Sequence, residues 1–197
     1  GVLGDISDSY RDCARDVYEA GTHLLELVNN VLDVSKLSNG SMALQLAEDD
    51  IVSVTQEATK LVSDDIKKRH HKLILNLPQK PLMMPCDRLK LKQILINILS
   101  NAAKFTPDKG EISVTLTVLD DEICFAIQDN GVGMSPNDIP RALARFSQLH
   151  PSGVKESAGT GLGLPLAKLL VELHGGRLSI ESDLGKGTTV RITLPRV

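Results

Sequence analysis

The sequence predicts an α+β fold: a two-layer sandwich, with one mixed sheet and helices on one face, preceded by a single long helix. Three observations support this. Apolar residues at helical spacing run unbroken through residues 10–34. Beyond residue 40 both helical and alternating patterns occur, but strand and helix do not alternate strictly. Two alternating segments, 112–118 and 123–127, flank the turn Asp120-Asp121 and predict an antiparallel hairpin.

Composition excludes several classes of protein. The net charge of −3 gives no basic field, so we expect no nucleic-acid partner. No apolar run approaches the roughly 20 residues needed to cross a bilayer, and no signal peptide opens the sequence. The three cysteines show neither disulfide nor metal-ligand spacing, which indicates buried thiols in a reducing compartment. The first residue is Gly1 rather than Met, so we expect a piece of a longer protein.

The first helix is expected from Asp8 to Leu37, and Ser38-Asn39-Gly40-Ser41 ends it with turn chemistry. Its apolar seam alternates spacings of three and four over about four heptads. Three further apolar residues widen this seam as in a four-helix bundle. We therefore expect partner helices outside this chain; the alternative is that the helix packs on its own domain. The seam is Tyr10, Cys13, Val17, Ala20, Leu24, Leu27, Val31 and Val34, widened by Leu25, Val28 and Leu32.

Residues 41–197 mix strands and helices around one long polar loop. Asp49 or Asp50 is expected to cap one helix, and Asp87 another. We predict strands at 42–46, 73–77, 112–118, 123–127, 177–182 and 188–194, helices at 50–69, 87–104 and 160–174, and a loop or lid at 134–158.

The helix after Asp87 has two stripes. The core stripe is Leu91, Leu95, Ile98, Ala102 and Phe105, and the polar stripe is Gln93, Asn97, Asn101 and Lys104. A surface stripe would more simply be Glu and Lys, because Asn disfavours helix. Amide oxygens can instead ligate Mg²⁺ beside substrate phosphates, and an ammonium can bind phosphate. An ordinary polar face is the alternative.

Two glycine-containing segments follow. In AIQDNGVGM, residues 126–134, an apolar strand ends at Asp129, whose carboxylate can accept from an exocyclic amine such as that of adenine; a simple turn is the alternative. In GTGLGLPLAKLLVELHGG, residues 159–176, glycines open a helix and direct backbone N–H groups at an anion. No strand precedes that segment and no Gly-Lys-Ser/Thr follows, so neither a Rossmann nor a Walker loop fits. His174 is interpreted as a helix C-terminal residue.

In order, these segments resemble the N, G1, F and G2 boxes of sensor histidine kinases, within the GHKL ATPases and their Bergerat fold. The matching segments are residues 97–105, 129–133, 145–148 and 159–163. HLLELVNNVLDVSKLSNG, residues 23–40, is similar to the second helix of the dimerisation and phosphotransfer (DHp) hairpin, nearest the PleC/DivJ/PdhS type of alphaproteobacterial kinase. The resemblance thus implies two domains: 1–40, a remnant of that hairpin, and 41–197, the catalytic ATP-binding domain.

The resemblance also implies roles for individual residues. Asn101 would ligate Mg²⁺ with Asn97 beside it, and Lys104 would contact phosphate. Asp129 would accept from the adenine amine, and Phe146 of the F box would help position the lid. The implied nucleotide contacts are Asn101, Lys104, Phe105, Asp129, Gly131, Gly133, Phe146, Gly159, Thr160, Gly161, Leu162 and Gly163, with Asn97, Asn101 and Lys104 catalytic.

The family's phosphoacceptor motif, the H box, does not occur here. None of the five histidines has the required neighbours, and His23 is followed by Leu24-Leu25 rather than an acid. The resemblance therefore implies a cytoplasmic catalytic portion of a two-component kinase. It would move the ATP γ-phosphoryl to a histidine outside this chain, for relay to a response regulator receiver domain, within a homodimer of a parent that could be membrane-anchored. The alternatives are a pseudokinase or interaction module, and another GHKL class such as a protein-serine kinase or chaperone-type ATPase.

Overall fold

The structure is a computed structural model that describes residues 7–39, 41–147 and 161–196. The chain divides into two compact units, residues 1–41 and 42–197. The domain boundary expected near residue 40 was assigned by resemblance to a hairpin, and that assignment stays a prediction.

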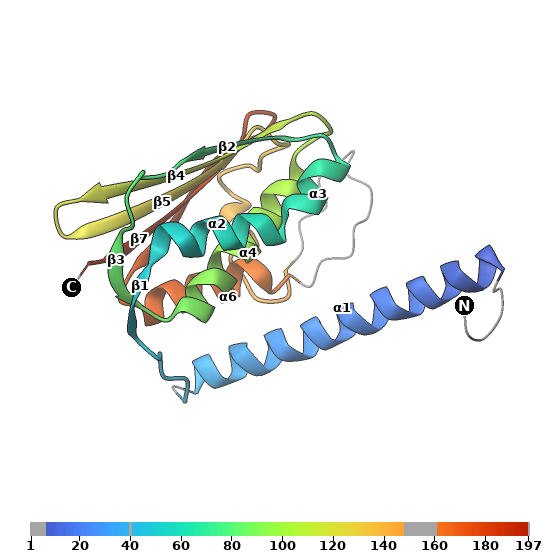
Figure 1. The fold of residues 1–197 in the computed structure, drawn as a ribbon, viewed down its shortest axis with the longest axis horizontal. Helices are drawn as coiled ribbons and strands as arrows, with labels where there is room; N and C mark the ends of the chain where they lie inside the picture. The colour runs from blue at the N-terminus through green and yellow to red at the C-terminus, as the bar shows by residue number, and fades with distance from the viewer. Residues whose placement is uncertain (1–6, 40, 148–160, 197) are drawn as a thin grey trace. The chain divides into compact units, whose positions relative to one another are not determined.

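The first unit is the helix α1, Asp8–Ser38 (Figure 1). Much of its apolar seam is exposed: the exposed fraction is 72% for Tyr10, 73% for Val17 and 62% for Leu24. Among the described residues, no helix combines the length and apolar character needed to cross a membrane.

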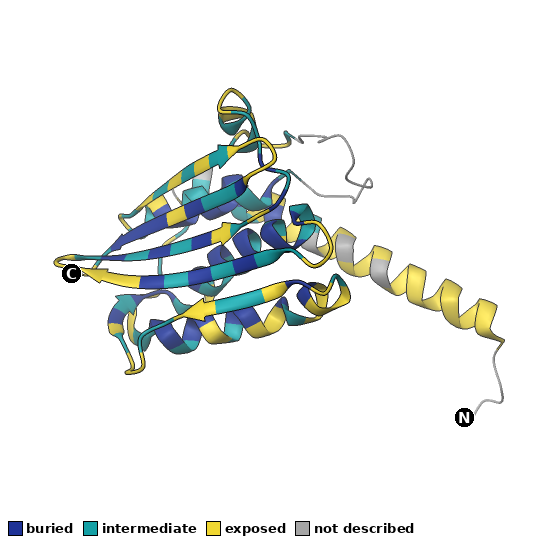
Figure 2. Ribbon diagram, turned by 90° about the horizontal axis from the view of Figure 1, so that it is seen from above, coloured by how far each residue is buried: buried dark blue, intermediate teal, exposed yellow. Residues whose placement is uncertain are grey.

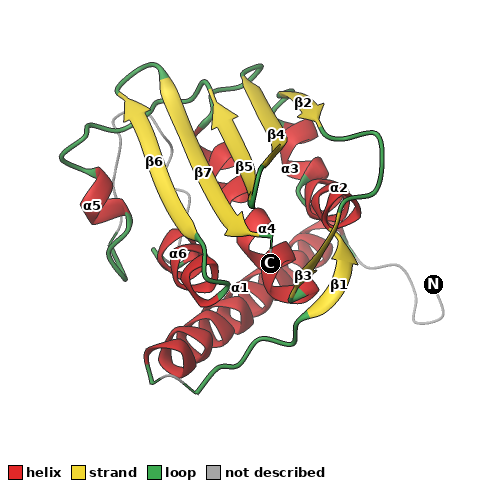
Figure 3. Cartoon of the chain, turned by 90° about the vertical axis from the view of Figure 1, so that its left-hand side faces the viewer, coloured by secondary structure: helices red, strands yellow, loops and turns green. Residues whose placement is uncertain are grey.

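The second unit is built on a five-stranded sheet of order β2-β4-β5-β7-β6 (Figure 3). Strands β2 and β4 are parallel and the other neighbours are antiparallel, so the sheet is mixed as predicted. The strands are β2 Lys72–Asn76, β4 Glu111–Leu119, β5 Glu122–Asp129, β6 Arg177–Asp183 and β7 Gly187–Pro195. A separate antiparallel pair is formed by β1, Ala47–Asp50, and β3, Met83–Cys86.

Helices cover one face of this sheet and leave the other open, which confirms the predicted two-layer arrangement (Figures 1 and 3). The covering helices are α2 Ile51–Leu61, α3 Ser63–Lys68, α4 Arg88–Phe105 and α6 Gly163–Leu173; α5 Ile139–Ala142 is a single turn. Burial alternates along the strands, as Figure 2 shows. Ile112, Phe125 and Ile192 are fully buried on the covered face, so the core lies between sheet and helices.

Both predicted caps are present. Asp50 accepts from the N–H of Val52 at 3.1 Å. Asp87 accepts from the N–H of Lys90 at 3.1 Å and fixes the start of α4. At the same end of the helical layer as Asp87, His174 ends α6, and its Nδ1 lies 2.8 Å from the Leu170 carbonyl. Because Nε2 of the same ring accepts from the N–H of Asp87 at 3.3 Å, His174 also joins the end of α6 to the start of α4.

Several element predictions were wrong. Residues 42–46 are not a strand; the strand starts only at Ala47, because backbone pairing with β3 decides where it begins. The helix expected over 50–69 breaks at Val62 into α2 and α3. The strand β3 was not predicted at all, since four residues containing Pro85 show no clear alternation. The last helix begins at Gly163 rather than at Thr160.

Candidate functional site

The two stripes of α4 separate as the sequence predicted. Leu91 and Leu95 are fully buried, and Ile98 and Ala102 are 2% and 4% exposed. The polar residues of the other stripe are half-buried. Phe105 was expected in the core stripe but is half-buried, because α4 ends there, beyond the packed layer. The Lys104 ammonium lies 5.2 Å from the centre of the Phe105 ring, a cation–π contact.

The polar stripe of α4 faces the start of α6. A Cβ placed on Gly163 would lie 3.7 Å from both Cγ and Oδ1 of Asn97. The amide nitrogen of Asn97 is buried and has no hydrogen-bond partner among the described residues. A buried donor without a partner costs about 1–3 kcal/mol, so this group calls for an explanation, and a bound ligand or ion is one. Asn97 therefore lies where the N-box and G2-box segments meet.

Asp129 ends β5 and its carboxylate is held by the backbone. Oδ1 accepts from the N–H of Gly131 at 2.8 Å and from the N–H of Thr188, on β7, at 3.2 Å. Burial raises the pKa of Asp129 above its ordinary value, and these two N–H donors oppose the rise. The two donors fix the carboxylate through Oδ1, so its other oxygen is the one that can meet a ligand.

The loop after Asp129 is interlocked with other parts of the site. The N–H of Val132 donates to the Phe105 carbonyl at 3.1 Å, and its own carbonyl accepts from Gly185 at 2.8 Å. Gly133 has a φ of +62°, and a Cβ there would lie 2.0 Å from the Asp183 carbonyl oxygen. A side chain at this position would therefore force the loop away from the β6–β7 turn.

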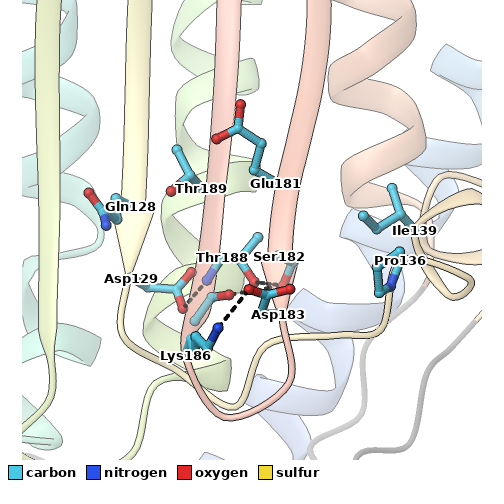
Figure 4. Close-up of a pocket in the computed structure, with 11 residues that line it drawn as sticks. Gln128, Asp129, Pro136, Ile139, Glu181, Ser182, Asp183, Lys186, Thr188 and Thr189 are labelled. Atoms are coloured by element: carbon cyan, nitrogen blue, oxygen red, sulfur yellow. Dashed lines mark hydrogen bonds and ion pairs between the residues drawn. The ribbon is translucent and has the colours of Figure 1, made fainter.

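A pocket of about 410 Å³ opens beside this loop and turn (Figure 4). Asp129, Ser182 and Thr188 contribute to its wall from three different strands, and Pro136 and Ile139 close it on the other side. Among the predicted site residues that the structure describes, Asp129 alone lines this pocket. The amide stripe of α4 forms a separate part of the site, near α6.

Lys104 contributes to a second hollow of about 370 Å³, together with Arg69, Lys68 and Ser100. Arg69 donates to the Lys104 carbonyl at 3.0 Å. Burial, and then the charge of Arg69, lower the pKa of Lys104. Adjacent cations favour a bound anion, because an anion relieves their repulsion.

The F-box and G2-box segments also meet. Phe146 donates its backbone N–H to the Gly161 carbonyl at 3.2 Å, and its side chain is 65% exposed. Gly161 has a φ of +66°, and a Cβ there would lie 2.8 Å from the Ser147 carbonyl oxygen. Leu162, expected among the nucleotide contacts, is fully buried at the start of α6. Gly159, Thr160 and Gln148 lie outside the described residues.

Apart from Asp129, sequence reasoning missed the residues that line this pocket, among them Thr188 and Ser182. Thr188 pairs with Asp129 across β5 and β7, and Ser182 pairs with Thr188 across β6 and β7. The only signal in the sequence was a hydroxyl directly after the turn glycine Gly187, and that signal is common. Among the described residues, no group of three or more His, Cys, Asp or Glu side chains could hold a metal ion.

Comparison with known proteins identifies the class of this fold and site. Residues 86–197 match the sequence profile of the family described as "Histidine kinase-, DNA gyrase B-, and HSP90-like ATPase". The chain belongs to this family, and the predicted GHKL membership is confirmed.

Within that family, the relatives found are histidine kinases. The chain is 40% identical over 195 residues to "Histidine protein kinase DivJ" of Caulobacter vibrioides, covering 98% of this chain and 32% of that protein. It is 35% identical to "Cell-division control histidine kinase PdhS" of Brucella suis, covering 99% of this chain and 20% of the relative. The predicted resemblance to this type of kinase is confirmed, and the chain holds a histidine-kinase ATPase domain. It spans about a third or less of the length of these relatives.

Solved structures of histidine kinases have the same fold as this chain. The chain is similar to full-length ShkA in complex with AMPPNP, with a TM-score of 0.81 and 28% identity, covering 98% of this chain and 40% of that one. It shares its fold with ThkA in complex with the response regulator protein TrrA, with a TM-score of 0.72 and 19% identity, covering 99% and 54% of the two chains. The fold class is therefore that of histidine-kinase catalytic domains.

Proposed function

We propose that this chain is the ATP-binding catalytic portion of a two-component histidine kinase, which transfers the γ-phosphoryl of Mg-ATP to a histidine on a DHp helix. The observation that carries the proposal is the Asp129 carboxylate. It sits at a strand end in a 410 Å³ pocket and is oriented by two backbone N–H donors. Such a carboxylate suits an adenine amine, a hydrogen-bond donor, and opposes the carbonyl of guanine.

The base end of the site is assigned to Asp129, Gly131, Gly133 and Thr188. A Cβ on Gly131 would lie 2.6 Å from the Phe105 carbonyl oxygen, so only glycine lets the backbone pass this close to the end of α4. Phe105 is half-buried and supplies an apolar surface next to that crossing. The known relative ShkA was solved with AMPPNP, an adenine nucleotide, which supports the same ligand class here.

The phosphate end is assigned to α4 and to the start of α6. Mg²⁺ takes few protein ligands and keeps phosphate oxygens and waters, so one amide oxygen from Asn101, with Asn97 adjacent, fits this ion. The helix α6 begins at Gly163, directly after the glycine loop, and a helix N-terminus attracts phosphate. The Lys104 ammonium adds charge, and Gly159 and Thr160 are proposed to complete the loop.

These residues act by position and charge. Phosphoryl transfer needs the γ-phosphoryl held in line and its developing charge neutralised, and little covalent chemistry from the protein. Asn101 orients the metal ion, Lys104 offsets charge on the phosphate oxygens, and Asp129 anchors the opposite end of the nucleotide. Phe146, which pairs with Gly161 through its backbone, is placed to couple the lid to this cradle.

The partners follow from α1 and from the missing H box. We assign residues 1–40 to the second DHp helix, and the exposed seam of α1 to packing in a homodimer through such helices. The acceptor histidine then lies on a DHp helix, in the parent protein or supplied in trans, and a response regulator receiver domain receives the phosphoryl group. The solved pair of ThkA with TrrA is a kinase of this fold with such a regulator. ATP-dependent transfer places this domain in the cytoplasm.

The test is titration calorimetry with Mg-ADP and Mg-ATP on the chain, on Asp129→Asn and on Asp121→Asn. Asp129→Asn keeps the shape but turns an acceptor oxygen into a donor, and affinity should fall at least tenfold. Asp121 lies in the exposed β4–β5 turn and serves as the matched control. Unchanged affinity in Asp129→Asn would sink the assigned site.

Transfer itself is tested with labelled ATP and a separate domain that carries an H-box helix. Acid-labile, base-stable label on that domain indicates phosphohistidine and supports the proposal. Acid-stable label would indicate serine chemistry instead. Nucleotide binding with no transfer to any such domain would point to a binding module.

A further inference from the structure

The segment that follows α3 is fastened to the segment that follows α4. Arg69, the first residue after α3, accepts the N–H of Lys109 at its backbone carbonyl, at 2.9 Å. Two residues further on, Nε2 of the buried His71 lies 3.1 Å from the Thr106 carbonyl. Because a carbonyl only accepts, Nε2 carries the proton and donates it there. The backbone of Arg69 is therefore fixed relative to the end of α4.

The side chain of Arg69 reaches the last turn of α4. Its Nη1 donates to the Lys104 carbonyl at 3.0 Å. The last four carbonyls of a helix have no partner within the helix, so they need partners from elsewhere. The next carbonyl, that of Phe105, accepts from the N–H of Val132 at 3.1 Å. Two separate segments therefore hold the end of α4, one through the Arg69 side chain and one through the loop after Asp129.

The two cations at this place lack carboxylate partners. Among the described residues, neither Arg69 nor Lys104 forms an ion pair, whereas the neighbouring Lys68 lies 4.0 Å from the Asp65 carboxylate. After burial, the charge of Arg69 is the cause that lowers the pKa of Lys104, so the two cations act on each other. Repulsion between like charges favours an ammonium turned away from Arg69, and the Lys104 ammonium lies 5.2 Å from the centre of the Phe105 ring.

We propose that Arg69 is a positioning residue for the phosphate end of the site. Its guanidinium binds the backbone of Lys104 and repels the Lys104 ammonium, which therefore stays directed at the nucleotide phosphates instead of turning into the hollow that Arg69 and Lys68 also line. The inference rests on the proposed phosphate role of Lys104. It adds a residue from the end of α3 that acts on the nucleotide only through Lys104.

The test compares ATP and adenosine, each competing with a fluorescent ADP analogue, in the wild-type chain and in Arg69→Ala. ATP affinity should fall about tenfold, because the ammonium is neither anchored nor directed. Adenosine affinity should change by less than about twofold, because adenosine has no phosphate. Equal losses for ATP and adenosine would indicate a general loosening of the site and would overturn the proposal.

Lys68→Ala is the matched control. It removes a cation that lines the same hollow but that pairs with Asp65 rather than with the backbone of α4. Its ATP affinity should stay within about twofold of the wild type, because the charge of an exposed side chain is largely screened. A loss as large as that of Arg69→Ala would show that net charge alone matters and would overturn the proposal.

A double-mutant cycle with Lys104→Met separates positioning from direct contact with phosphate. Lys104→Met keeps an unbranched side chain but removes the charge, and by itself it should lower ATP affinity about tenfold. Adding Arg69→Ala to Lys104→Met should lower ATP affinity by less than about twofold further. If the full loss from Arg69→Ala persists without the Lys104 ammonium, Arg69 acts on the phosphates by itself, and the inference is overturned.

Two conservative variants identify the property of Arg69 that matters. Arg69→Lys keeps a charge and a donor and should retain ATP affinity within about threefold of the wild type. Arg69→Gln keeps only the donor and should lie between the wild type and Arg69→Ala; if Arg69→Ala unfolds, as shown by circular dichroism, Arg69→Gln replaces it in the cycle. A folded Arg69→Lys as weak as Arg69→Ala, or Arg69→Gln as strong as the wild type, overturns the inference.

Failure of the proposed function has a different result. If Lys104→Met binds ATP as tightly as the wild type, the proposed phosphate end is wrong, and the role of Arg69 is overturned with it. If Lys104→Met is weakened but Arg69→Ala is not, the inference about Arg69 alone is overturned.

Discussion

The helices α1 and α4 have similar apolar patterns but different surroundings. The seam of α1 is largely exposed, with Tyr10 at 72% and Leu24 at 62%. The seam of α4 is closed against the sheet and its neighbouring helices, and Leu91 and Leu95 are fully buried. The same periodicity therefore has two outcomes: α4 finds its cover within its own compact unit, and the described part of α1 does not.

The difference shows how function is divided between the units. Because the sheet and α2 and α6 satisfy the apolar stripe of α4, its opposite stripe can hold Asn97 and Asn101, which contribute nothing to the core. Burying a leucine contributes about 1.5–3 kcal/mol, so burial of the exposed α1 seam against other helices would stabilise their association. The catalytic unit should fold by itself, whereas α1 should depend on association.

The largest expected effect tests this division directly. Leu95→Ala should lower the free energy of unfolding by about 3 kcal/mol, because it opens a cavity at a fully buried site. Leu24→Ala on α1 should change the unfolding of the catalytic unit by less than about 0.5 kcal/mol. The chain has no tryptophan for fluorescence, so urea denaturation of both variants is followed by far-ultraviolet circular dichroism. Equal losses would contradict the independence of the two units.

The second effect concerns association. Leu24→Glu places a charge in the exposed seam and should weaken self-association at least tenfold, because that charge would be buried on assembly. Sedimentation velocity across a range of concentrations gives the dissociation constant. Arg11, outside the seam and exposed, supplies the control variant Arg11→Glu. A monomeric wild-type chain at high concentration would show that this seam is covered in some other way.

The third effect sharpens the contrast on α4. Asn101→Ala should lower Mg-ATP affinity about tenfold, yet raise stability by about half a kcal/mol, because alanine favours helix. Leu89→Ala, at an exposed position in the first turn of the same helix, should leave both stability and affinity nearly unchanged. Calorimetry with and without Mg²⁺ measures the change in nucleotide affinity, and thermal melting measures the change in stability. If the affinity loss is the same without Mg²⁺, the metal role of Asn101 is wrong.

The smallest effect is a pH dependence at Asp129. Burial raises its pKa in the folded chain, so the folded state binds a proton more readily than the unfolded state, and ionising Asp129 destabilises the fold as pH rises through this window. Asp129→Asn should therefore be at least as stable as the wild type at neutral pH, with the difference vanishing in acid below the unfolded pKa. Thermal melts of both proteins from acidic to neutral pH measure it. Nucleotide affinity should show the opposite trend, falling as acid protonates the carboxylate.

Local patterns predicted most of this fold. Asp50 and Asp87 were correct caps because a capping side chain contacts the next turn of its own helix. The β4–β5 hairpin was correct because alternation and a tight turn are short-range properties. The β1–β3 pair was missed, because its paired residues, such as Asp50 and Met83, lie more than 30 residues apart along the chain. The break at Val62 was missed as well.

The candidate site likewise has one part that the sequence predicted and another part that only the tertiary structure revealed. The sequence alone determined that α4 has an amide stripe, that Asp129 follows an apolar strand and that glycines precede α6, since periodicity and backbone freedom are local properties. Tertiary structure alone decided that Thr188 donates to Asp129, that Ser182 binds Thr188 and that Asn97 faces Gly163. Those contacts depend on the register of β5, β7 and β6 and on helix packing, and register is set by the whole buried face of the sheet rather than by the residues it brings together.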